Sequence, residues 1–134
     1  SNAEHFLYNF IALAILGYFL EPRIGSLHML LLTAFSMCVE AWAWMQTASP
    51  DSSVVGFSGT LYAYYVILAY FFILLDRFWG TVFTAIVIGK VALSMFGIDF
   101  LVTNAAHTSH VGGAFVGIFA CVLLHFGRAG LPKQ

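Results

Sequence analysis

The chain has 134 residues, of which 61% are hydrophobic and 8% are charged, whereas a typical soluble domain has about 25% charged residues. So few charged side chains cannot cover a water-exposed surface, and the composition therefore excludes an ordinary soluble domain and predicts an integral membrane domain. The formal net charge is -1 and the basic residues are dispersed, so we expect no nucleic acid among the partners.

A membrane-length window finds five apolar runs, at residues 6–20, 27–47, 57–75, 78–97 and 107–127. We therefore predict an all-α bundle with five transmembrane helices, formed by residues 4–134 as a single domain. Ser1-Asn2-Ala3 is interpreted as a remnant of cloning. The first run is short for a bilayer of about 30 Å at about 1.5 Å per residue, so we expect its start to lie below the surface or the bilayer to thin there.

The positive charges predict how the chain crosses the membrane, because short cytoplasmic loops collect Lys and Arg. The basic residues that follow the first, third and fifth runs are Arg23, Arg77, Arg128 and Lys133. The connections at 48–56 and 98–106 contain no Lys or Arg. We therefore expect the chain to start outside and end in the cytoplasm, in the inner membrane of a bacterium.

The first run begins with two polar side chains and ends in a turn signal. His5 and Asn9 are four residues apart and so share one helix face at the outer end. Such side chains can donate to a developing oxyanion, or they can simply hydrate the start of a helix. At the other end, Pro22 is predicted to stop the helix and Gly25 to permit the turn.

The third run begins at Ser58, which lies between Gly56 and Gly59. Glycines at these positions allow a sharp entry into the helix and close approach to a neighbouring helix. The Gly-x-Ser-Gly pattern alone favours helix packing over a catalytic serine.

His110 opens the fifth run and is followed by Gly113 and Gly117, a spacing that lets transmembrane helices pack backbone to backbone. Under the predicted topology, Ser58 and His110 start their runs on the same side of the membrane. A hydroxyl is a weak nucleophile until a base removes its proton, so a serine and a neutral histidine at one depth form the minimum acyl-transfer pair.

Three further ionisable residues need an explanation. Glu40 and Lys90 lie within apolar runs, where a charge is costly and must find a partner, water or a shallow position. Structural pairing or snorkelling is favoured for both, over an ion pathway. His107 lies one turn before His110, but zinc needs three or four ligands, so no metal site is predicted.

Together these residues resemble the rhomboid family of intramembrane serine proteases. The resemblance extends over nearly the whole chain, in the order and spacing of its motifs: His5-x-x-x-Asn9, Leu16-Gly17, the stretch at 20–26, Gly56-Phe57-Ser58-Gly59 with Tyr62, and His110-x-Gly112-Gly113-x-x-x-Gly117. The family core has six transmembrane helices and this motif order begins at its second, so we expect the usual first helix to be missing here.

The resemblance implies a role for each matching residue. Ser58 would attack the scissile carbonyl and His110 would act as the general base. His5, Asn9 and the backbone N–H of Ser58 would form the oxyanion hole, and Tyr62 would orient His110. The family uses no cofactor, so none is expected.

The function implied is that of an intramembrane serine endopeptidase, which cleaves transmembrane or membrane-proximal segments of membrane proteins through an acyl-enzyme. Its partners would be transmembrane protein substrates and the lipid bilayer, and the oligomeric state is left open. One alternative is a rhomboid-like pseudoprotease that binds transmembrane helices without cutting them. Another is a small transporter or channel, which would need polar residues at mid-membrane depth on several helices.

Overall fold

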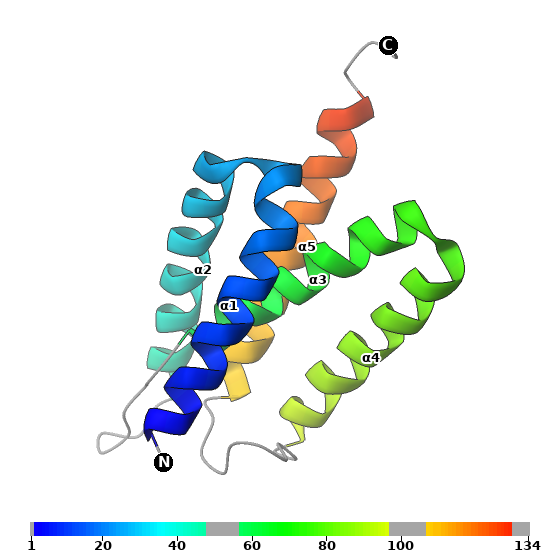
Figure 1. Cartoon of the computed structure of the whole chain (residues 1–134). Helices are drawn as coiled ribbons and strands as arrows, with labels where there is room; N and C mark the ends of the chain where they lie inside the picture. The colour runs from blue at the N-terminus through cyan, green and yellow to red at the C-terminus, as the bar shows by residue number, and fades with distance from the viewer. Residues whose placement is uncertain (1, 48–56, 97–106, 130–134) are drawn as a thin grey trace.

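The computed structural model of the chain describes residues 2–47, 57–96 and 107–129 (Figure 1). These ranges form helices and no strand: α1 (Asn2–Ile24), α2 (Ser26–Thr47), α3 (Ser58–Leu75), α4 (Arg77–Met95) and α5 (His107–Ala129). Each predicted apolar run corresponds to one helix. By length and composition, α1, α2, α3 and α5 meet the requirements for crossing a membrane. The prediction of an all-α membrane bundle is confirmed.

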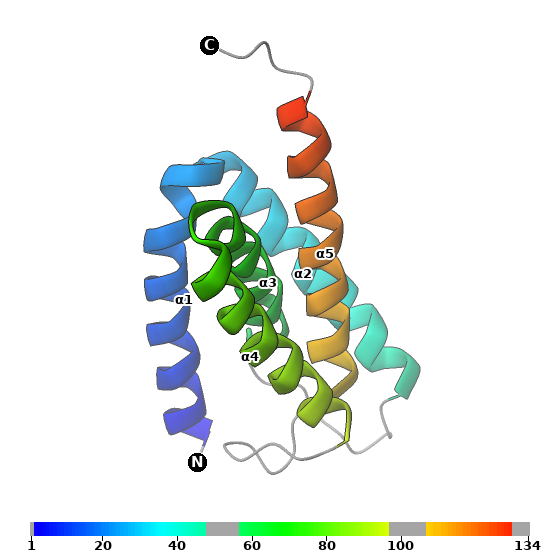
Figure 2. The ribbon, with the colours of Figure 1, turned by 90° about the vertical axis from the view of Figure 1, so that its right-hand side faces the viewer.

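Helix α3 is at the centre of the bundle. It contacts each of the other four helices, and ten of its 18 residues are buried. The two views show α2 and α4 on opposite sides of α3, with α5 crossing α3 (Figures 1 and 2). Any residue on the buried part of α3 is therefore held from several directions.

The core is formed mainly where α1 meets α3, with Leu16 and Leu20 packed against Tyr64, Ile67 and Phe71. The outward faces, by contrast, are also apolar. Large hydrophobic side chains remain exposed on every helix, among them Tyr18, Leu30, Leu75, Phe78 and Phe126. An exposed apolar surface of this extent matches lipid tails rather than water.

The junction of α1 and α2 differs from the prediction. Pro22 does not stop α1, which continues to Ile24. Pro22 has no N–H to donate to Tyr18 O, so one i→i−4 hydrogen bond is absent, and the helix ends two residues later. The turn is made instead by Gly25, whose φ of +84° is left-handed and whose N–H donates to Glu21 O at 2.8 Å.

The expectation of a short first span is also wrong. Helix α1 has 23 residues, which correspond to about 35 Å at 1.5 Å per residue and suffice for a bilayer core of about 30 Å. The hydropathy window placed the ends of this run at residues 6 and 20 because polar residues lie beyond them. In the structure Glu4 and Glu21 are nevertheless helical.

Replacing Gly25 with alanine is expected to destabilise the bundle by about 1–2 kcal/mol, because an L residue is strained in the left-handed region. Gly17→Ala is the matched control. Gly17 lies inside α1, and a Cβ added there would have no heavy atom within 4 Å, so alanine should be neutral or slightly stabilising. Thermal unfolding in detergent micelles measures both, and equal unfolding temperatures would contradict the role assigned to Gly25.

Candidate active site

Ser58 and His110 are brought together by the amino-terminal ends of α3 and α5. Ser58 is the first residue of α3, and His110 lies in the first turn of α5. His110 Nε2 is 3.0 Å from Ser58 Oγ, which is hydrogen-bond distance. His110 is 3% exposed, and Ser58 is half-buried. When Nε2 is the unprotonated nitrogen, the serine hydroxyl donates to it, as a general base requires.

The imidazole of His110 stacks on an aromatic ring of the same helix that carries Ser58. Tyr62 lies one turn after Ser58, and its ring centroid is 4.5 Å from that of His110, with 17° between the planes. Tyr62 is buried. This stacking restricts rotation of the imidazole and so favours the orientation in which Nε2 faces Ser58.

Close contact between the backbones of α3 and α5 makes this geometry possible. A Cβ on Gly113 would overlap Gly59 O, and a Cβ on Gly117 would lie 2.7 Å from Ala63 O. Both positions therefore need a residue without a side chain. The remaining predicted packing glycine, Gly56, lies outside the described residues.

The two polar residues of α1 pair with each other. Asn9 Nδ2 is 3.0 Å from His5 Nε2, and Asn9 is buried. With the amide nitrogen as donor, the histidine accepts at Nε2, and Asn9 keeps a second N–H. Among the described hydrogen bonds of this pair, none reaches Ser58. Helix α1 does pack against α3, and so the pair lies on a helix next to the serine.

Glu40 of α2 fills the space behind the serine. Its Oε1 accepts hydrogen bonds from Ser36 Oγ at 2.9 Å and from Thr60 Oγ1 at 2.8 Å. A Cβ on Gly59 would overlap Glu40 Cδ, so the carboxyl group occupies the place of a side chain there. Glu40 is thus buried and paired, and pairing is one of the two outcomes predicted for it from the sequence. Its partner Thr60 could not be predicted, because 20 residues separate the two.

Lys90 of α4 also finds a partner near the serine. Its ammonium nitrogen lies 5.4 Å from the centroid of the Tyr62 ring. The sequence predicted pairing or snorkelling for this lysine but held no signal for an aromatic partner, since contacts between α3 and α4 do not follow from helical periodicity.

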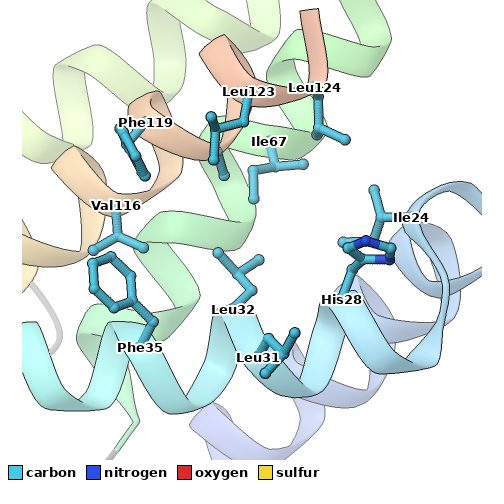
Figure 3. A pocket seen from close by; sticks show the side chains of 11 residues that line it. Ile24, His28, Leu31, Leu32, Phe35, Ile67, Val116, Phe119, Leu123 and Leu124 are labelled. Atoms are coloured by element: carbon cyan, nitrogen blue, oxygen red, sulfur yellow. The ribbon is translucent and has the colours of Figure 1, made fainter. Parts of the chain in front are cut away.

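The cavity in Figure 3 is separate from these polar residues. It has a volume of about 240 Å³ and lies between α2 and α5 near the junction of α1 and α2. Its lining is apolar apart from His28: Ile24, Leu31, Leu32, Phe35, Ile67, Val116, Phe119, Ala120, Leu123 and Leu124. The cavity lining contains none of the candidate residues Ser58, His110, His5 and Asn9.

Membrane-length helices with apolar outer faces define an integral, multi-pass membrane protein. The family model described as Rhomboid domain matches residues 1–126, and the chain belongs to the rhomboid family. Neither the curated proteins nor the solved structures that were compared with the chain gave a match.

Gly113→Ala is expected to push α3 and α5 apart and to destabilise the bundle by about 1–3 kcal/mol, the usual cost of overpacking. Gly127→Ala is the matched control in the same helix, because nothing lies within 4 Å of its Cβ position. Thermal unfolding in micelles compares the two variants. If Gly113→Ala unfolded at the temperature of Gly127→Ala, the close contact with Gly59 would be disproved.

Proposed function

We propose that the protein is an intramembrane serine endopeptidase that cleaves transmembrane or membrane-proximal segments of membrane proteins. The observation that supports this most strongly is the 3.0 Å separation of Ser58 Oγ and His110 Nε2 at the start of two membrane-length helices. Membership of the rhomboid family supports the same reaction class, and the stretches around these two residues resemble the motifs of that family.

In the first half of the reaction, His110 Nε2 takes the proton of Ser58 as Oγ attacks the carbonyl carbon of the substrate. The resulting imidazolium then gives this proton to the leaving amine as the peptide bond breaks, which leaves the acyl group on Ser58. In the second half, His110 takes a proton from water, the hydroxide attacks the ester, and the proton returns to Ser58 Oγ.

The stacked Tyr62 ring serves His110 throughout this cycle. The ring holds the imidazole in place while the imidazole is neutral. Because an aromatic face also attracts a cation, the ring favours the imidazolium that forms after proton transfer. The pair thereby obtains from an aromatic residue the orientation that a carboxylate gives in a catalytic triad.

The developing oxyanion would be bound by the backbone N–H of Ser58 and by the side chains of His5 and Asn9. The first intrahelical bond of α3 joins Leu61 N to Phe57 O at 3.1 Å, so the N–H of Ser58 precedes the hydrogen-bonded turns and is available to a ligand. The positive end of the α3 dipole adds to this stabilisation.

A substrate must present an extended segment to this pair. Backbone hydrogen bonds shield the peptide bonds of a transmembrane helix, so small or helix-breaking residues near the cut would favour cleavage. We place the protein in the inner membrane of a bacterium, with Ser58 toward the extracytoplasmic side and the C-terminus in the cytoplasm, and the lipid bilayer as its second partner.

A fluorophosphonate probe tests the proposal, because it reacts much faster with an activated serine than with an ordinary hydroxyl group. The full-length protein in phospholipid vesicles should be labelled, Ser58→Ala should not, and the control Ser26→Ala should be labelled like the wild type, since Ser26 lies exposed at the α1–α2 junction. Absence of labelling in the wild type would favour a pseudoprotease that binds transmembrane helices without cutting them.

The base and the oxyanion donors should differ in their effect on turnover. His110→Ala should abolish cleavage, because it removes the group that takes the proton of Ser58. Asn9→Ala should lower kcat by about 10²–10³, the usual cost of one oxyanion donor. Tyr8→Phe, at an exposed neighbour, is the control, and cleavage of a fluorogenic transmembrane peptide is the measurement. Full activity of Asn9→Ala would remove Asn9 from the oxyanion hole.

A further inference from the structure

A charged side chain of α4 reaches the aromatic ring that supports His110. Lys90 Nζ lies 5.4 Å from the centroid of Tyr62. The His110 ring stacks on the same tyrosine at 4.5 Å, and His110 Nε2 is 3.0 Å from Ser58 Oγ. Three successive contacts therefore connect α4 with the serine.

The contact of Lys90 with Tyr62 is energetically meaningful for a residue in this position. A cation within about 6 Å of an aromatic centroid is attracted by the negative face of the ring. A lysine within an apolar helix gains from such a partner, because an ammonium group is costly wherever lipid tails surround it. Lys90 is exposed toward the surroundings of the bundle, and the ring of Tyr62 supplies an interaction on its inner side.

The packing of α4 leaves it few neighbours in the bundle. Within the described residues, α4 packs against α3 and α5 and makes no contact with α1 or α2, and it lies on the right-hand side of the bundle in Figure 1, which is the side that faces the viewer in Figure 2. Lys90 thus brings a side chain of α4 into contact with Tyr62, the residue that stacks on His110.

We propose that Lys90 is a positioning residue for His110. Its ammonium group holds the Tyr62 ring where the imidazole stacks on it, and so keeps Nε2 directed at Ser58. The inference rests on the proposed function for its kinetic consequence. Lys90 acts through Tyr62 and not by touching the scissile bond.

The kinetic test measures saturation of Ser58 labelling by a fluorophosphonate in the full-length protein. Lys90→Met and Lys90→Gln should lower the maximal labelling rate about two- to five-fold, the range for an exposed cation–π contact, without changing the half-saturating concentration. Lys90→Arg keeps the cation and should restore the wild-type rate. Ile86→Met, at another exposed position of α4, is the control for a general disturbance of the helix.

Three results would overturn the inference. These are a wild-type rate in Lys90→Met, an Arg variant as slow as the Met variant, and a change confined to the half-saturating concentration. The last result would mean that Lys90 contacts the reagent rather than supporting the base.

A second measurement is independent of activity. The chain has two lysines, Lys90 and Lys133, so ¹³C labelling of lysine gives two ε-methylene signals, assigned with Lys133→Arg. The Lys90 signal should be shifted upfield by the ring current of Tyr62, and Tyr62→Leu should abolish the shift. A wild type that reacts at Ser58 but lacks the shift overturns the role of Lys90, whereas a shift without any labelling of Ser58 overturns the proposed function instead.

Discussion

The backbone contact between Gly59 and Gly113 is the constraint on which the rest of the site depends. Helices in a membrane gain no hydrophobic energy by leaving lipid, so close packing and polar contacts must hold them together. Because a Cβ on Gly113 would overlap Gly59 O, α3 and α5 lie as close as backbones allow. At that separation, side chains as short as serine and histidine meet across the interface.

The polar groups around this contact follow from the same geometry. α3 begins one residue before Gly59 and α5 begins six residues before Gly113, so the positive dipole ends of both helices lie on the Ser58 side of this contact. Glu40 lies behind Gly59, where its carboxyl group receives the hydroxyls of Ser36 and Thr60. A buried polar group in the membrane is tolerable only with such partners, which explains why the apolar α2 has its glutamate at this level. Ser58, His110 and the side chains packed around them thus lie near one level of the bundle.

Much of this arrangement could be predicted from the sequence, and the failures have physical causes. Apolar runs of membrane length indicated five helices, and the agreement in depth of Ser58 and His110 followed from counting crossings. Helix ends were less accurate, because hydropathy detects where apolar residues stop and not where hydrogen bonding stops. Pro22 therefore marked an end that Gly25 actually makes. The partners of Glu40 and Lys90 were beyond prediction, since contacts between helices depend on the rotation of each helix about its axis.

Mass spectrometry of the fluorophosphonate adduct tests the close packing of α3 against α5 and the reactivity of Ser58 together. In vesicles, the wild type should contain one adduct per chain, on the peptide with Ser58. Gly113→Ala should lose that adduct while its circular dichroism stays helical, because the serine and histidine would no longer meet. An adduct on Ser58 in Gly113→Ala at the wild-type rate would contradict the account.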